Sequence, residues 1–186
     1  MKALYLAVSA AALAATLPAS ASATSLSYGN QFTNACYEAA VMKRANDSSF
    51  AMCNTALTRE ASTRGDQRVA VLVNRGILRM VAHDSKGALS DFDHALALDP
   101  TQSEAWLGKA IEHWKAGDSA NAIAFADRAI RLRTLKPELA YLIRGLANEE
   151  RGRVKAAYAD LKRARELAPD WSRPKEELAR YRVVRR

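Results

Sequence analysis

Few residues in this chain of 186 residues are of types that could carry out chemistry. Cys36 and Cys53 are the only cysteines, and they stand seventeen positions apart. The three histidines, His83, His94 and His113, have no nucleophile or carboxylate at a fixed short spacing, and they make no zinc-type spacing with the cysteines. We therefore expect no enzyme, no metal site and no cofactor.

The first residues indicate where the protein is delivered. Met1 and Lys2 precede an alanine-rich apolar run that is too short to cross a bilayer, and Ala21 and Ala23 are the small residues typical of a cleavage site. Residues 1–23 are therefore predicted to be a signal peptide, cut after Ala23 or after Ala21. An uncleaved anchor is the alternative. We expect a bacterial periplasmic protein, or a secreted one, without a transmembrane segment in the mature chain.

This compartment bears on the two cysteines. In an oxidising environment a disulfide between Cys36 and Cys53 is the default expectation. Two free buried thiols are the alternative.

Charge is concentrated at one end of the chain. The formal net charge is +8, yet residues 24–150 hold fifteen Lys and Arg against fifteen Asp and Glu, whereas residues 151–186 hold twelve against five. An anionic component of the cell envelope could bind there, and the candidate contacts are Arg180, Arg182, Arg185 and Arg186. The alternative is a solvated helix face. Nucleic acid is not expected, because an exported protein rarely meets it.

One sequence outline occurs three times. The stretch "ALSDFDHALALDP" at residues 88–100 returns as "AIAFADRAIRLRT" from residue 122 and as "AYADLKRARELAP" from residue 157. Ala88, Ala122 and Ala157 are thus 34 and 35 residues apart, and the same spacings separate Gly76, Ala110 and Gly145. Such a period is typical of a solenoid, and each unit contains two helical patterns separated by a short break. We predict stacked helical hairpins in an all-α protein.

Particular positions of these units resemble the tetratricopeptide repeat (TPR). In the first unit the matching residues are Leu72, Gly76, Ala88, Phe92, Ala95 and Pro100, and in the third they are Tyr141, Gly145, Ala157, Leu161, Ala164 and Pro169. The middle unit departs at Ala110 and Ala126, and Pro137 is expected to replace its missing terminal proline. The resemblance implies a right-handed α-solenoid with three repeats at residues 69–102, 103–137 and 138–171.

Two further segments flank these repeats. Residues 24–68 are predicted to form a degenerate first hairpin that the disulfide would hold at the open end of the array. Residues 172–186 are predicted to form a capping helix, begun by Ser172 as its N-cap, and a basic tail.

The resemblance also points to a binding surface. In TPR proteins the first helices of successive hairpins line an inner groove, and the matching positions here are Val73, Asn74, Ile77, Met80, Leu107, Ile111, Trp114, Leu142 and Leu146. Most are apolar, and Asn74 could bond a peptide backbone. Packing between hairpins is the alternative role for each residue. The sequence therefore predicts an exported scaffold that binds a protein or peptide partner of unknown identity. The alternative is an electrostatic binder of anionic envelope polymers or lipid head groups.

Overall fold

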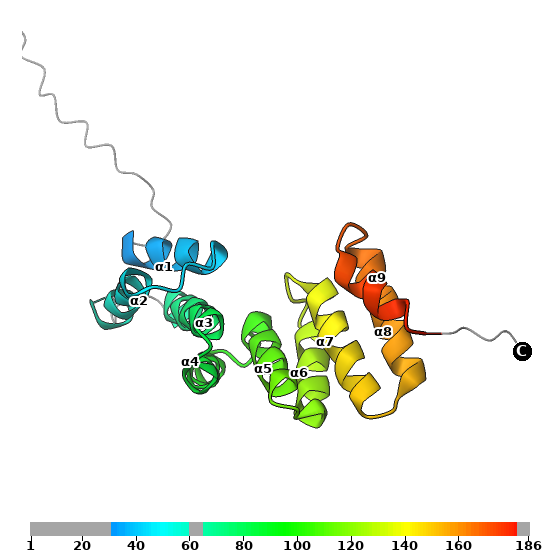
Figure 1. Ribbon diagram of the computed structural model, residues 1–186. Helices are drawn as coiled ribbons and strands as arrows, with labels where there is room; N and C mark the ends of the chain where they lie inside the picture. Colours follow the sequence, from blue (N-terminus) through cyan, green and yellow to red (C-terminus); the bar gives the residue numbers. More distant parts are fainter. Residues whose placement is uncertain (1–30, 60–64, 182–186) are drawn as a thin grey trace, which may run out of the picture.

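The computed structural model describes residues 31–59 and 65–181, and this part of the chain forms nine α-helices and no strand. The helices are α1 (Gln31–Val41), α2 (Asp47–Arg59), α3 (Gly65–Val81), α4 (Ser85–Leu98), α5 (Ser103–Lys115), α6 (Ser119–Arg131), α7 (Pro137–Glu150), α8 (Val154–Leu167) and α9 (Ser172–Leu178). Consecutive helices pair into four hairpins that stack side by side, and α9 packs on the last hairpin (Figure 1). The predicted all-α helical-repeat fold is confirmed.

The turns inside the hairpins follow the sequence period. His83, Gly117 and Gly152 occupy equivalent turn positions with φ of 61°, 77° and 70°, a left-handed conformation that costs least at glycine. The next helix starts at once, because Asp84 accepts a hydrogen bond from the backbone N–H of Gly87 at 2.9 Å and Asp118 accepts one from that of Asn121 at 3.2 Å. These caps make the hairpins tight.

Phe92 fills the space between the first two TPR-like hairpins. Its side chain is fully buried between Gly76 on α3 and Gly108 on α5. A Cβ atom at Gly76 would lie 2.6 Å from ring atom Cε1, and one at Gly108 would lie 2.9 Å from the same atom and closer still to Cε2 and Cζ. Both helices can therefore approach the ring only because neither residue has a side chain.

The two ends of the stack are closed differently. Cys36 on α1 and Cys53 on α2 are fully buried and form the predicted disulfide. At the other end, Leu178 and Tyr181 pack against the core of the α7–α8 hairpin. The predicted signal peptide (1–23), Arg182, Arg185 and Arg186 lie outside the described residues.

Two helix boundaries differ from the predictions. Pro137 is the first residue of α7 and does not end α6; the turn after α6 is made by Arg133, whose φ is 58°. Ser172 is the first residue of α9, and the N-cap position is held by Trp171, which makes no side-chain cap bond. Pro137 thus starts a helix where it was expected to end one, and α9 starts one residue earlier than an N-cap at Ser172 would give.

Candidate functional site

All nine residues predicted to line the groove lie on the first helices of the hairpins, α3, α5 and α7. Four of them are buried, with exposed fractions of 4–7%: Val73, Leu107, Leu142 and Leu146. Each belongs to a core cluster shared between neighbouring helices. These four side chains fill the interior of the stack and add little to its surface.

The other five are half-buried: Asn74, Ile77, Met80, Ile111 and Trp114. Ile77 packs against the cores of both the α1–α2 and the α3–α4 hairpins, and Ile111 packs against two clusters formed by α5, α6 and α7. These side chains therefore join neighbouring hairpins with one edge and keep the other edge in solvent. They are the part of the predicted groove that a partner can touch.

Trp114 is held in place by a neighbour that the sequence analysis did not find. Its indole N–H donates a hydrogen bond to Glu150 Oε1 at 2.9 Å, and the other oxygen of the Glu150 carboxylate accepts one from the hydroxyl of Ser119. Glu150 thus ties the end of α7 to both α5 and α6. The polar edge of Trp114 is already satisfied, so only its ring is available to a partner.

Asn74 is the only amide among the nine residues predicted to line the groove. Its side chain is half-buried on α3 and makes no hydrogen bond with any described residue. A primary amide has two donors and an acceptor with two lone pairs, and it can satisfy both the N–H and the C=O of an extended chain. Asn74 is therefore equipped to bond a peptide backbone beside Ile77.

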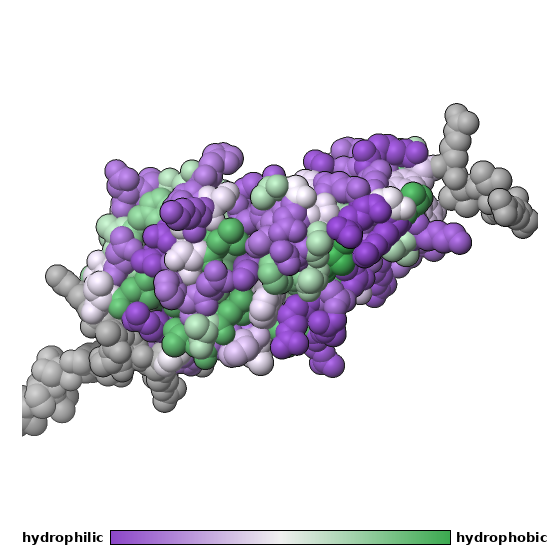
Figure 2. All heavy atoms as spheres, turned by 90° about the horizontal axis from the view of Figure 1, so that it is seen from below, coloured by the Kyte–Doolittle hydropathy of each residue, from purple (hydrophilic) through white to green (hydrophobic). Residues whose placement is uncertain are grey.

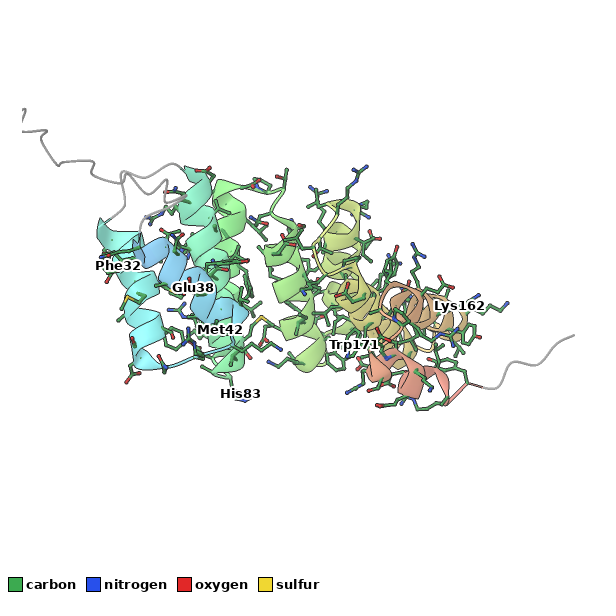
Figure 3. All side chains as sticks on the ribbon, turned by 90° about the horizontal axis from the view of Figure 1, so that it is seen from above. Phe32, Glu38, Met42, His83, Lys162 and Trp171 are labelled. Atoms are coloured by element: carbon green, nitrogen blue, oxygen red, sulfur yellow. A yellow bond between two sulfur atoms is a disulfide. The ribbon has the colours of Figure 1, made fainter. Side chains whose placement is uncertain are left out.

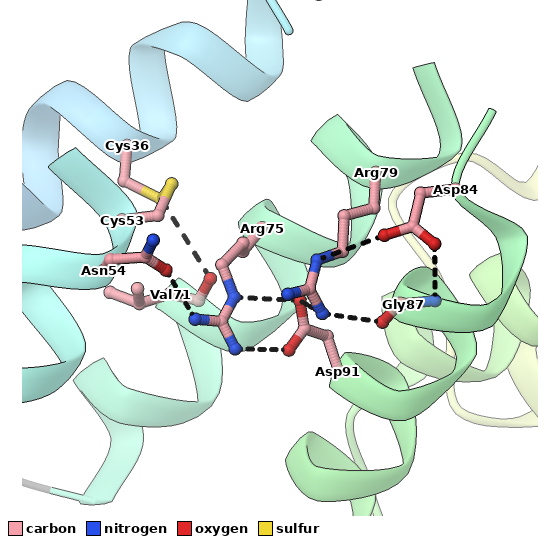
Figure 4. A network of polar contacts seen from close by, with 9 residues as sticks. All are labelled: Cys36, Cys53, Asn54, Val71, Arg75, Arg79, Asp84, Gly87 and Asp91. Atoms are coloured by element: carbon pink, nitrogen blue, oxygen red, sulfur yellow. Dashed lines mark hydrogen bonds and ion pairs between the residues drawn. A yellow bond between two sulfur atoms is a disulfide. The ribbon is translucent and has the colours of Figure 1, made fainter. Parts of the chain in front are cut away.

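A cation occurs at the same position of each repeat, directly before the recurring small residue Gly76, Ala110 or Gly145. Arg75, Lys109 and Arg144 are 34 and 35 positions apart. Arg75 donates to both oxygens of Asp91 at 2.9 and 2.6 Å and to the side-chain oxygen of Asn54 at 2.7 Å (Figure 4).

The third repeat reproduces this arrangement, since Arg144 donates to both oxygens of Asp160, at 2.9 and 2.7 Å, and to Asp127 at 2.9 Å. The hydrogen bonds to Asp160 raise the pKa of the Arg144 guanidinium, in spite of its burial. In both repeats one arginine spans three consecutive helices. These arginines are occupied by internal partners and are not available to an external anion.

In the middle repeat an aromatic ring replaces the carboxylate. Lys109 Nζ lies 4.7 Å from the centre of the Phe125 ring, which stands at the position of Asp91, and its ion pair is with Asp93 on α4 at 2.5 Å. His113 stacks edge-on against Phe125, with ring centres 5.0 Å apart, and its Nδ1 lies 2.9 Å from Asp118. His113 is thus a structural residue of the α5–α6 hairpin.

Asp118 has the most clearly perturbed acidity among the described carboxyl groups. Hydrogen bonds from the Asn121 side chain, from His113 and from the Asn121 backbone lower the pKa of Asp118 to about 2. The two contacts with Asn121 cap α6 and the contact with His113 joins Asp118 to α5, so the lowered pKa of Asp118 has structural causes.

The basic end offers charges of two kinds. Arg180 lies 2.6 Å from both Glu149 and Glu177, so its charge is compensated within the protein. Five exposed cations of the same region have no acidic partner among the described residues: Arg151, Arg153, Lys155, Arg165 and Lys175. Hydrophilic residues prevail over this half of the molecule on the face shown in Figure 2, whereas apolar residues gather over the N-terminal half.

Within residues 31–59 and 65–181, no three His, Cys, Asp or Glu side chains come together as a metal site would require. No helix in this part of the chain is long and apolar enough to span a membrane.

Stacked hairpins, small residues at their contacts and a partly exposed inner face define an α-solenoid of the helical-repeat class. The family model described as a tetratricopeptide repeat matches residues 73–137 and again residues 109–170, which together cover more than half of the chain. The chain therefore belongs to the tetratricopeptide repeat family. No match is found among curated proteins.

Several solved structures have a similar fold. The first TPR domain of Spaghetti (RPAP3), bound to the HSP90 peptide SRMEEVD, is 22% identical, with 61% of this chain and 89% of that chain covered at a TM-score of 0.57. A double mutant of MamA from RS-1 is 18% identical, with 79% of each chain covered and a TM-score of 0.63. PilW, a type IV pilus biogenesis factor, is 23% identical, with 82% of this chain and 69% of that chain covered and a TM-score of 0.67. Identities this low establish the shared fold alone.

Proposed function

We propose that this protein is an interaction module that holds a peptide or a segment of a partner protein along the inner faces of α3 and α5. The contacts are Asn74, Ile77, Met80, Ile111 and the ring of Trp114. The free amide of Asn74, half-buried on an inner helix three residues before Ile77, is the single observation that carries the proposal. The RPAP3 domain, which has the same fold, was solved with a bound peptide.

Each of these groups would gain free energy from a bound segment. A half-buried Asn without a partner has lost part of its hydration and regains hydrogen bonds when a backbone lies beside it. Ile77, Met80 and Ile111 keep apolar edges in solvent, and covering them contributes about 25 cal/mol per Å². Together they favour an extended segment with apolar side chains at alternate positions.

Site-specific photocrosslinking in the native cell tests this proposal. A photoreactive residue at Met80 or Ile111 should give one defined adduct, identified by mass spectrometry, while the same residue at Ala124 or Ala159, exposed on α6 and α8, should not. Asn74→Ala should lower the yield of the Met80 adduct. Equal adducts from inner and outer positions, or none from the inner ones, would show that this face is not the binding surface.

The unpaired cations favour a second candidate function. Arg151, Arg153 and Lys155 surround the α7–α8 turn without acidic partners, and this end could bind an anionic envelope polymer or lipid head group. Binding of this kind weakens steeply with salt. Sedimentation with vesicles containing an anionic lipid, at low and at high salt, distinguishes it: loss of binding in an R151E/R153E/K155E variant, with Met80 crosslinking intact, assigns the two functions to separate surfaces.

The cellular location of the protein is part of the same proposal. Export followed by cleavage after Ala23 or Ala21 places it in the periplasm or outside the cell. Amino-terminal sequencing of the protein from a fractionated native host tests this, and a chain that begins at Met1 in the cytoplasmic fraction would contradict it.

A further inference from the structure

The first described helix of the stack has an outer face that no other described helix covers. On α1, Cys36, Ala39 and Ala40 point into the core, whereas Tyr37 and Val41, together with Met42 directly after the helix, have exposed fractions of 58%, 61% and 62%. Glu38 is also exposed, and together the four residues form a continuous stripe at helical spacing. Figure 3 views α1 from the side opposite α3 and labels Glu38 and Met42 along it.

The opposite end of the stack does not share this character. The exposed residues of α9 are polar or charged and include Arg173, Lys175 and Glu176. If the apolar face of α1 docked on α9 of another copy, it would bury these charges, which is costly. Head-to-tail stacking is therefore disfavoured, and the partner must present another surface.

The charges around the stripe suggest which surface that is. Glu38, Lys43 and Arg44 are exposed, and none has an ion-pair partner among the described residues. The anion lies within the stripe, while both cations follow the end of α1. When two such helices run antiparallel about a two-fold axis near residue 40, the C-terminal end of one α1 lies beside the middle of the other. Lys43 and Arg44, which follow the end of α1, then lie near Glu38 of the second copy.

We propose that two copies of this chain associate through the outer faces of their α1 helices, antiparallel about a two-fold axis. Tyr37, Val41 and Met42 form the apolar centre, and Glu38 pairs with Lys43 of the other copy on both sides. A two-fold contact of one surface with itself closes at the dimer and gives no filament. Because only one short helix per copy takes part, the interface is at the small end of specific interfaces and the dimer is weak.

Sedimentation velocity on the full exported chain, from about 1 to 500 μM, tests the proposal. We expect a monomer–dimer equilibrium with a dissociation constant of tens of micromolar or more. Val41→Glu should raise the dissociation constant at least about tenfold, because two carboxylates would enter the apolar centre of the interface. The matched control is Leu135→Glu, since Leu135 is 82% exposed in the α6–α7 turn; this variant should dimerise like the parent.

Charge reversal identifies the partner and its orientation. Glu38→Lys alone and Lys43→Glu alone should each weaken the dimer severalfold, because each places like charges opposite one another, and the double variant should restore it. Failure of this rescue, assembly beyond the dimer, or an unaffected V41E dimer would overturn the proposal. So would a chain that stays monomeric over the whole range, or one that dimerises only after residues 24–30 are removed, because that segment would then be the occupant of the α1 face.

Discussion

Gly108→Ala is the sharpest test of how the first two TPR hairpins are joined. The added methyl group would lie 2.9 Å from Cε1 of Phe92 and closer to two more ring atoms, all below any normal carbon–carbon contact. The ring is fully buried and is held on its other side by Gly76, so it cannot swing away. Overpacking of this kind costs about 3 kcal/mol at the upper end of its range.

The same substitution also stabilises helix α5, because alanine inside a helix is more favourable than glycine by about 1 kcal/mol of folding free energy. The expected net loss is therefore about 2 kcal/mol in the free energy of unfolding, measured by urea denaturation followed by circular dichroism. Gly65→Ala is the control, since a Cβ atom there meets nothing within 4 Å; it should leave the stability unchanged or raise it slightly.

A double-mutant cycle assigns the loss to the ring. Phe92→Leu alone should destabilise the protein by removing buried atoms, but in the Gly108→Ala background it should cost less, because the smaller side chain makes room for the methyl group. A Gly108→Ala variant as stable as the wild type, or an equal cost of Phe92→Leu in both backgrounds, would show that the ring does not need the space at Gly108.

Three further changes probe other parts of the fold. Asp91→Ala should cost about 3 kcal/mol in denaturant unfolding, because it leaves Arg75 and Arg79 without the buried carboxylate that both contact; a loss below 1 kcal/mol would count against a structural role for this pair. His83→Gly should raise the free energy of unfolding by about 0.5–1 kcal/mol by relieving a left-handed φ of 61°, whereas His83→Ala should give no such gain in the same measurement. The pKa of Asp118 is lowered from 3.8 to about 2, so its charge contributes stability that is complete above pH 4 and is lost as the pH falls toward 2; the difference in unfolding free energy between the wild type and Asp118→Asn should shrink over this interval, and a constant difference would contradict the assignment.

The sequence predicted the structure well at positions where packing permits only one kind of side chain. Ala88, Phe92 and Ala95 were matched to positions of the tetratricopeptide repeat and are fully buried, and the two cysteines form the expected disulfide. Each of these positions needs a small side chain, a large apolar one or a thiol, and few alternatives meet that need. Family membership followed from the same residues.

The inner surface was harder to predict, because on a helix the groove-lining and core positions are adjacent. Val73 and Leu142 lie on inner helices yet face the core, while Ile77 keeps one edge in solvent. Which of two neighbouring positions is covered depends on the angle between hairpins, and that angle is set by contacts such as Phe92 against Gly108. No single residue encodes it.

Other features were present in the sequence and were missed. Arg75, Lys109 and Arg144 follow the same 34- and 35-residue spacing as the alanines, so the period itself could have identified them as structural. The contact of Glu150 with Trp114 and Ser119 is different, since it occurs in one repeat and joins residues up to 36 positions apart. Only the folded geometry shows it.

The three repeated cations, Arg75, Lys109 and Arg144, join neighbouring hairpins through different kinds of contact. In a linear array each junction between neighbouring units has its own coupling energy. Arg75 reaches the preceding hairpin through the neutral amide of Asn54, whereas Lys109 and Arg144 reach it through the carboxylates of Asp93 and Asp127, which are 58% and 36% exposed. Salt screens exposed ion pairs and leaves a hydrogen bond to an amide almost untouched. High ionic strength is therefore expected to weaken the polar contacts that join the central and the C-terminal unit to their preceding hairpins, and to leave the contact of the first unit with the disulfide-bonded hairpin almost unchanged.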